Sequence, residues 1–510
     1  MTIAQRASTA TAAALSFLLT LCFVGCQPAT TDAPATNATS ANAANANAAA
    51  TPAASAGANS QPVTLAVLDA LFADEAFARD LKSRLQLTDD QIARLKKAAD
   101  EERAGLRESD EPSGTTAGAT ERARAKVREV VGAEKADQFF ALASERWAGG
   151  DAGASADAGG RMSATAEKPN AVPSDTRVVV NAPAFRMDVF EQGRLVKSYK
   201  VGIGYPEFPL PVGMRKADQI IFNPEWTPPD EPWVEAPGSK VKIGEKVASG
   251  SKLNPLGPVK IPIGLPSLIH GGKSPARLGQ FASHGCVGLT DPLSLEVARE
   301  LARLGGAAVT DEDVKTYQQD RTKPKNVKLP QAVPVELRYE TMVVTDDGKL
   351  HVYRDVYDRG TNTEENLRGV LQAHGVSLDQ LSEQERSQAL DAVRQMARDA
   401  TGNPPDGGGT ERPDTGAANR NAAGSNANDA SKNANAAGKN ANAAKGAANK
   451  NANAAAAAPK VTRNVKGQKE IVIEIAALKG KGYPVPVGGG FGTKGQDKQD
   501  ATALKKGKRR

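Results

Sequence analysis

Three long stretches of this chain consist almost entirely of small and polar residues, and they limit folding to the segments between them. Residues 27–62 are rich in Ala, Asn, Thr and Pro, residues 148–172 in Gly, Ala and Ser, and residues 402–460 in Asn, Ala, Lys and Gly. Such segments have too few large apolar side chains to offset the entropy lost on folding. We therefore predict a multidomain chain in which folded parts are joined by long disordered linkers.

The segment between the first two linkers, residues 63–147, has a helical pattern. Ile92 and Leu95 share one helix face, and the preceding TDDQ fits a capping box at a helix start. A second helix is expected to run from Val127 to Trp147. We predict a small helical domain, with a helical hairpin as its simplest form.

From about residue 175 the pattern changes to the alternation typical of strands. Apolar residues alternate over 185–201 on both sides of a Gln192-Gly193 turn, which predicts a hairpin. Prolines are dense from 206 to 266, and proline lacks the N–H that a sheet ladder needs. That part is expected to form extended loops and edge strands, not helices.

Further elements are expected toward the C-terminus. Residues 292–304 predict an amphipathic helix with Pro292 in its first turn. A strand pair is expected at 333–356 around an Asp347-Gly348 turn. Beyond it we expect a short helical segment at 362–400, and over 461–510 one short strand, to which no role could be assigned, followed by a basic tail.

The N-terminal segment predicts export. Arg6 precedes an apolar run that ends in small residues, as in a secretory signal, and the run is shorter than the roughly 20 residues that span a bilayer. Residues 23–26, FVGC, resemble a bacterial lipoprotein signal, which implies a signal peptide over 1–26 and a lipid on Cys26. Gln27 favours the outer membrane by the same resemblance. We expect a membrane-anchored lipoprotein facing the periplasm, with a plain signal peptide as the alternative.

Basic residues are concentrated in the tail, although the net charge of the chain is only +6. In an exported protein such a tail suits anionic wall polymer or lipid headgroups, or simply keeps the protein soluble. No nucleic-acid partner is expected.

One cysteine stands out in the sequence ASHGCVG. The chain has three cysteines and four histidines, and two of the cysteines, Cys22 and Cys26, belong to the export signal. Cys286 is therefore alone in an oxidising compartment, where an unpaired thiol is a liability unless it is used. A free thiol is only about 3% thiolate at neutral pH, so a nucleophilic cysteine needs a base. His270 and His284 are the nearby candidates.

The histidines and the cysteine also allow interpretations other than nucleophilic catalysis. Cys286 could be a buried small hydrophobe and His270 a core histidine. The three side chains could instead bind zinc, but their spacing fits no zinc signature and a fourth ligand is not evident. Nucleophilic chemistry without a metal or cofactor is the favoured interpretation.

The histidine and cysteine segments resemble the active-site signature of L,D-transpeptidase catalytic domains, HG followed by SHGC[VI]. NPEWTPP at 223–229, NPLGPVK at 254–260 and the segment 329–357 also resemble the larger periplasmic members. The resemblance covers about 175–358. It implies a mainly-β domain, a curved mixed β-sandwich with short helices, and a cysteine acyltransferase that acts on peptidoglycan.

The resemblance also implies roles for individual residues. Cys286 would attack the amide that follows diaminopimelate in a tetrapeptide stem and form a thioester, with His270 as general base held in one tautomer by the Gly271 carbonyl. Backbone N–H groups around His284, Gly285 and Cys286 would form the oxyanion hole. The remaining expected site residues are Ser283, which holds the loop, and Lys273, Arg277 and Trp226, which contact substrate.

Two positions depart from the family pattern. Gly288 stands where the family has an arginine that can anchor a carboxylate, and Gly272 stands where it has threonine. Lys273 or Arg277 could replace the missing arginine, and the loop at Gly272 is expected to be looser. Two alternative functions follow: an L,D-carboxypeptidase or endopeptidase that passes the acyl group to water, and a non-catalytic wall-binding lipoprotein.

Overall fold

The computed structural model describes residues 61–109, 114–149, 168–228, 234, 239–264, 266–404 and 460–488. The predicted signal peptide with Cys26, nearly all of the first tether, most of the second and third linkers and the basic tail lie outside the described residues. Within the described part, no helix is both long and apolar enough to span a membrane.

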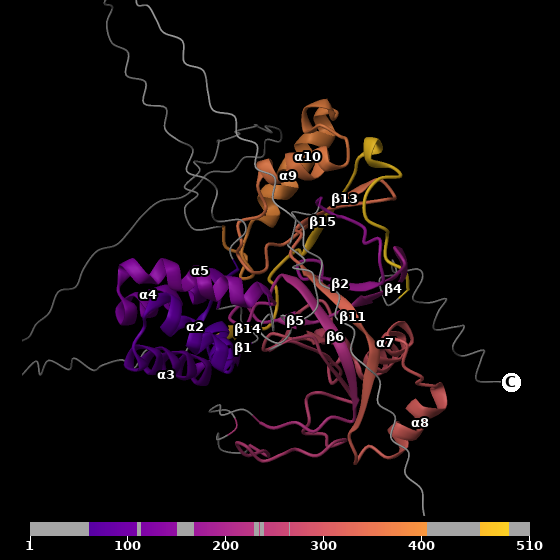
Figure 1. Cartoon of the computed structure of the whole chain (residues 1–510). Coiled ribbons are helices and arrows are strands. Elements are labelled where there is room, and N and C mark those ends of the chain that lie inside the picture. Colours follow the sequence, from indigo (N-terminus) through magenta and orange to yellow (C-terminus); the bar gives the residue numbers. More distant parts are fainter. Residues whose placement is uncertain are drawn as a thin grey trace, which may run out of the picture. The chain divides into compact units, whose positions relative to one another are not determined.

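The N-terminal region is helical, as the sequence predicts (Figure 1). The capping box at Thr88 is present. The expected hairpin was wrong, because the described residues 61–109 and 114–149 form five helices. The second predicted helix is broken at Gly132, whose φ of 85° is the left-handed conformation that glycine tolerates. The helices are α1 (Leu65–Phe72), α2 (Glu75–Leu85), α3 (Asp89–Gly105), α4 (Thr116–Val131) and α5 (Ala133–Gly149).

The centre of the following region is a mixed eight-stranded sheet with the order β10-β8-β7-β6-β11-β2-β3-β4. The pairs β8–β10 and β2–β11 are parallel and the others are antiparallel. The predicted hairpin is confirmed as β3 and β4. The strands are β2 (Arg177–Asn181), β3 (Arg186–Glu191), β4 (Arg194–Lys200), β6 (Gly213–Phe222), β7 (Val259–Pro262), β8 (Leu268–His270), β10 (Val287–Gly288) and β11 (Lys325–Arg338).

The expectation of edge strands in the proline-rich part was wrong. β6 and β7 lie in the interior of the sheet, between β11 and β8. The prolines do not interrupt them, because Pro211 precedes β6 and Pro262 is the last residue of β7. The strand interiors therefore keep the N–H donors that the ladder needs.

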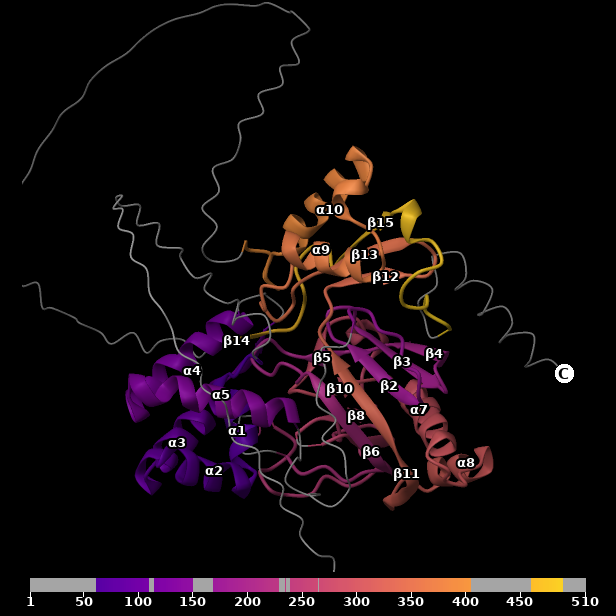
Figure 2. The same ribbon diagram turned by 45° about the horizontal axis from the view of Figure 1, so that its top comes forward.

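Helix α7 (Asp291–Leu304) covers one face of this sheet, with Pro292 in its first turn as predicted. Val297, Ala298 and Leu301 are fully buried in the same core as the strand residues Val259 and Ile261. Figure 2 shows α7, followed by α8 (Asp311–Gln319), beside the sheet. A separate parallel pair consists of β5 (Ile203–Gly204) and β9 (Phe281–Ser283). It adjoins the predicted site, because β9 ends three residues before Cys286.

A second, three-stranded sheet has the order β12-β13-β15. The predicted Asp347-Gly348 hairpin is present, but it joins β12 to β13, whereas β11 belongs to the large sheet. The strand without an assigned role, β15, pairs with β13. These elements are β12 (Met342–Thr345), β13 (Lys349–Tyr353) and β15 (Glu470–Glu474), with the predicted helices α9 (Glu364–Ala373) and α10 (Glu383–Met396).

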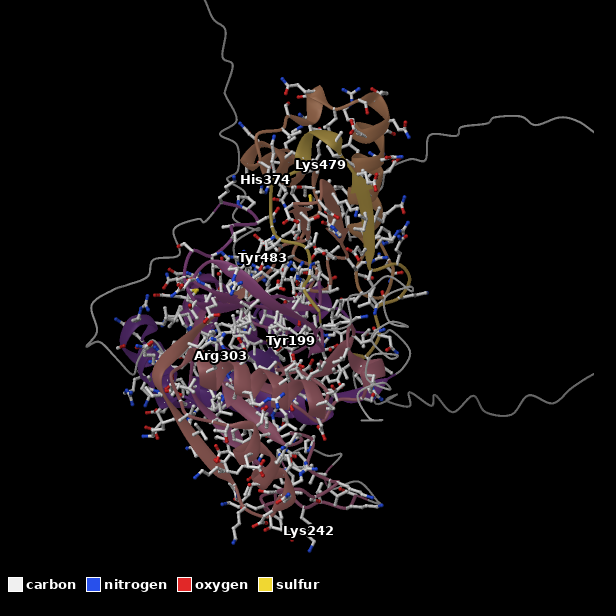
Figure 3. All side chains as sticks on the ribbon, turned by 90° about the vertical axis from the view of Figure 1, so that its right-hand side faces the viewer. Tyr199, Lys242, Arg303, His374, Lys479 and Tyr483 are labelled. Carbon is white, nitrogen blue, oxygen red and sulfur yellow. The ribbon has the colours of Figure 1, made fainter. Side chains whose placement is uncertain are left out.

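The two sheets are in contact through a small apolar cluster that includes Val179, Phe190, Val343 and Tyr483. Tyr483 is labelled in Figure 3. A further parallel pair joins distant parts of the chain, since β1 directly follows the N-terminal helices α1–α3 and β14 directly precedes β15. The remaining elements are β1 (Arg107–Ser109), β14 (Lys460–Thr462) and the 3₁₀ turns η1 (Pro275–Arg277), η2 (Leu378–Gln380) and η3 (Ala476–Leu478).

Candidate active site

The parallel pair of β8 and β10 brings the segments of His270 and Cys286 together. His270 is the last residue of β8, and Gly288 lies opposite it on β10. Cys286 belongs to the turn 284–286, which directly precedes β10.

Both side chains line a cleft of about 850 Å³. Of the residues predicted for the site, His284, Ser283, Lys273 and Trp226 also line it, and Arg277 does not. Other lining residues were missed from the sequence. Nothing in the sequence signals Leu106 and Val461, because they come from the segments of β1 and β14, which are hundreds of residues apart. Tyr205, Lys260 and Leu268 also line the cleft and were not predicted.

His270 is held as a neutral base. Its side chain is buried, and Nδ1 lies 2.7 Å from the carbonyl oxygen of Gly271, so Nδ1 carries a proton and donates it to this bond. Nε2 is then the unprotonated acceptor. Burial, and then the charge of Lys273, lowers the pKa of His270 to about 3, against the smaller opposite effect of the Gly271 bond. The imidazole is thus ready to accept a proton at neutral pH.

Cys286 is half-buried, and its thiol is free. Burial raises the pKa of Cys286, while a hydrogen bond with the Leu268 backbone and the charge of Lys273 act in the opposite direction. With its thiol pKa raised and the His270 pKa lowered, the cleft holds a neutral thiol and a neutral imidazole. An attack by this sulfur would need a base that takes the thiol proton during the attack, because no ion pair is formed beforehand.

A tight turn presents the cysteine. Ser283 Oγ accepts a hydrogen bond from the Cys286 N–H at 2.9 Å and donates one to the Cys286 carbonyl at 2.6 Å. Ser267 Oγ donates to the Gly285 carbonyl at 3.0 Å, and Gly285 has a φ of 94°, which requires glycine. The Cys286 N–H, which was expected in the oxyanion hole, is thus already bonded to Ser283, whereas the Gly285 N–H has no acceptor among the described residues.

His284 is exposed and does not have the environment of a base. Its ring meets the rings of Tyr205 and Phe208 edge-on, with centroids 5.2 and 4.6 Å away. Edge-to-face contacts of this kind fix ring orientation. The placement agrees with a supporting role.

The loop after His270 is tied to helix α7. The Gly272 N–H donates to Asp291 Oδ1 at 2.8 Å, and Gly272 has a φ of 79°. A Cβ at this position would lie 2.1 Å from the carbonyl oxygen of Pro255. Glycine is thus required at position 272 here, and the loop is bonded in place. Asp291 was missed, although its position in the first turn of the predicted helix was a usable signal.

Lys273 occupies the space that a side chain at position 288 would fill. A Cβ on Gly288 would lie 2.8 Å from Cγ and 3.0 Å from Cε of Lys273. Arg277, the other candidate replacement, belongs to η1 and donates a hydrogen bond to the Phe281 carbonyl. The structure brings only Lys273 to the cleft.

The other side of the cleft comes from the loop after β6 and from β7. Trp226 is half-buried and exchanges two backbone hydrogen bonds with Val247, at 3.1 and 2.7 Å. Lys260 on β7 lies directly opposite His270 in the antiparallel pair β7–β8. Nowhere in the described ranges do three His, Cys, Asp or Glu side chains gather as the ligands of a metal would.

A comparison with protein families matches residues 175–316 to the YkuD family, described as the L,D-transpeptidase catalytic domain. The comparison with curated proteins found no match. The family resemblance predicted from the histidine and cysteine motifs is confirmed for this part of the chain.

Solved structures similar to this chain are L,D-transpeptidases at low identity. A crystal structure of an Enterococcus faecium L,D-transpeptidase is 13% identical over 32% of this chain and 50% of that chain, with a TM-score of 0.20. The catalytic domain from E. faecium solved by NMR is 13% identical over 33% of this chain and 100% of that chain, with a TM-score of 0.19. An L,D-transpeptidase from Mycobacterium smegmatis is 15% identical over 32% of this chain and 58% of that chain, with a TM-score of 0.18. This chain spans about half the length of the first full-length structures that it matches.

Proposed function

We propose that this protein is a peptidoglycan L,D-transpeptidase that uses Cys286 to form a thioester with tetrapeptide stems and passes the acyl group to an amine. The acceptor amine belongs to a second stem, which gives a 3–3 cross-link, or to another amine or protein joined to the wall. The observation that carries the proposal is the placement of His270 and Cys286 in one cleft, with the histidine tautomer set by the Gly271 carbonyl.

The reaction would proceed in two balanced halves. The Cys286 thiol passes its proton to His270 Nε2 while sulfur bonds to the stem carbonyl, and the Gly285 N–H donates to the oxygen that becomes negative. The C–N bond then breaks, the proton moves from His270 to the leaving amine, and a thioester remains. In the second half the acceptor amine loses a proton to His270 and displaces the thiolate, which takes that proton back.

Export and anchoring belong to the same proposal, because the substrate lies outside the cytoplasm. We infer that Cys26 carries a lipid that anchors the protein in a membrane facing the periplasm, with the basic tail free to contact anionic wall polymer. Labelling of the expressed chain with a radioactive fatty acid tests this. Incorporation that is lost in Cys26→Ala supports the anchor, and equal labelling of both chains contradicts it.

Mass spectrometry tests the activity itself. The chain from residue 27 onward is incubated with a tetrapeptide-stem muropeptide, beside a Cys286→Ala control. A 3–3 dimer that depends on Cys286 supports the transpeptidase. Loss of only the terminal residue of the stem identifies the hydrolytic alternative. No product, with Cys286 still open to alkylation, favours a non-catalytic wall-binding protein.

A further inference from the structure

The loop 204–208, YPEF preceded by Gly204, lies between the N-terminal helices and the turn that presents Cys286. On the side of the turn, the Tyr205 N–H donates to the Ser283 carbonyl at 2.9 Å, and the rings of Tyr205 and Phe208 hold the ring of His284. Gly204 packs directly on Gly285, because a Cβ at position 204 would lie 3.1 Å from Gly285 Cα. Any displacement of this loop would therefore move His284 and Gly285 as well.

On its other side, the same loop is held by two helices. Thr64, the N-cap of α1, donates its hydroxyl to the Glu207 carbonyl at 2.6 Å. Thr116, in the first turn of α4, donates to the Pro206 carbonyl at 2.8 Å. Both threonine side chains are about 1% exposed, so neither hydroxyl can exchange its partner for water.

A second route joins α4 to Gly204. The Ala117 N–H at the start of α4 donates to Asp358 Oδ2 at 3.1 Å. The neighbouring Tyr357 donates its hydroxyl to the Gly204 carbonyl at 2.9 Å. Two independent sets of hydrogen bonds thus start on α4 and end on the loop 204–208.

The loop is also too stiff to absorb a displacement. Pro206 and Pro209 fix φ at two positions, and the Phe208 N–H closes a turn onto the Tyr205 carbonyl at 2.8 Å. Tyr205 and Phe208 are buried in the core of the sheet domain. A shift at Pro206 or Glu207 would be passed on to Tyr205 and Phe208 and not lost in the loop.

We propose that the helical region is a working part of the catalytic centre, in which Thr64 and Thr116 are positioning residues that set His284 and the Gly285 N–H through the loop 204–208. The inference rests on the proposed function, since it takes Cys286 as the reacting residue. It gives the helices a role beyond their own packing, and it predicts that catalysis is sensitive to anything that moves the starts of α1 and α4.

The test uses hydroxyl removal in the otherwise complete chain from residue 27 onward. Thr116→Val keeps the shape of the side chain and removes only its hydrogen bond, because the N-cap of α4 is Thr115. Thr64→Val removes the bond to Glu207 together with a helix cap. Thr88→Val is the matched control, since it removes a helix cap in the same region without contact to the loop. Thr64→Ser and Thr116→Ser keep the hydroxyl and should restore function.

Two readouts are needed: steady-state turnover of the stem peptide, and the rate at which iodoacetamide alkylates Cys286. We expect Thr64→Val with Thr116→Val to lower kcat about 10-fold with KM within about two-fold, and to slow alkylation about three-fold. Thr88→Val should lose comparable thermal stability with neither rate changed. Thr116→Val alone serves if the double variant does not fold.

The outcomes separate this inference from the proposed function. If kcat and alkylation in folded Thr116→Val match those of the Thr88→Val control, the helices do not position the site and the inference is overturned. If no stem peptide is turned over by any chain, the proposed substrate is wrong, yet the alkylation series still decides whether the helices act on Cys286.

Discussion

The eight-stranded sheet buries ionisable side chains at both of its ends, but the two ends treat them differently. Around β2, β3 and β11 each buried charge meets an opposite one: Arg177 and Arg338 contact Glu336 at 2.9 and 2.6 Å, and Arg186 contacts Asp188 at 2.8 Å. Around β8 and β10, His270 and Cys286 take part in no ion pair within the described chain. Their pKa values are moved chiefly by burial.

The paired charges at one end therefore stabilise the fold, whereas the unpaired groups at the other end are suited to chemistry. Paired charges fix the packing of the two sheets, since Tyr483 donates to Asp188 and lies against the guanidinium groups of Arg186 and Arg338. Unpaired groups keep their proton-transfer capacity, because no counter-ion stabilises their charged forms. The comparison predicts that substitutions at one end change stability and those at the other change rates.

The largest effect is expected at the cleft end. His270→Gln should lower kcat about 1,000-fold, because it removes the proposed base that accepts the thiol proton. The melting temperature should change little, since the one hydrogen bond lost joins His270 to its own neighbour, Gly271. Initial rates and a thermal melt of the same preparation check both parts. A variant that retains more than about a tenth of the activity would assign the base to another residue.

At the opposite end the pattern should be reversed. Arg338→Met leaves Glu340 without its cation and Glu336 with Arg177 alone, so the free energy of unfolding should fall by about 3 kcal/mol, while kcat per folded molecule is unchanged. Arg303→Met is the control. Its pair with Glu191 is half-exposed and should contribute less than about 1 kcal/mol. Urea unfolding curves of both variants measure this, and similar losses would contradict the distinction.

Glu207 belongs to neither end of the sheet, because it is buried at the junction with the helices. Burial raises its pKa to about 8, with Arg122 opposing and Glu102 and Asp358 reinforcing this effect. The folded state therefore holds a proton that the unfolded state releases above its usual pKa of about 4.5. The free energy of unfolding should therefore be highest below pH 4.5 and should fall as the pH rises through 8.

Glu207→Gln isolates this contribution. The variant should remove a decline on the order of 3 kcal/mol in the free energy of unfolding between about pH 5 and pH 9. Denaturant unfolding at several pH values measures the slope. The same decline in both chains would show that Glu207 is not its source.

Sequence patterns predicted the local features of this molecule well. The β3–β4 hairpin, helix α7 with Pro292 and the capping box at Thr88 depend on residues close in the chain. The motif around Cys286 and His270 is also local, and it predicted two side chains that line one cleft.

What could not be predicted depends on contacts between distant segments. The pairing of β15 with β13, and of β14 with β1, joins residues more than 100 positions apart, so no local pattern records it. Leu106 and Val461 line the cleft only through such pairing. The interior placement of β6 and β7 was missed because proline density was averaged over a segment, whereas only the position of each proline decides whether a strand can be paired on both sides.

The smallest effect concerns Gly288, the departure from the family pattern. Because Lys273 covers Gly288 and Arg277 is bonded to the Phe281 carbonyl, Lys273→Met should raise KM about 10-fold and Arg277→Met less than about two-fold. Lys273 also lowers the pKa values of both Cys286 and His270. Its loss should therefore move the pH midpoint of Cys286 alkylation upward.

A double variant gives the sharper form of this test. Lys273→Ala empties the space over Gly288, so Gly288→Arg in the same chain should fit there and bring KM back toward that of the starting protein. Gly288→Arg alone should be poorly tolerated, because its side chain would meet Lys273. Steady-state kinetics of the four chains measure the coupling. If Lys273→Met leaves KM unchanged, or Arg277→Met raises it equally, the carboxylate anchor lies elsewhere in the cleft, and Lys260, opposite His270, becomes the residue to substitute.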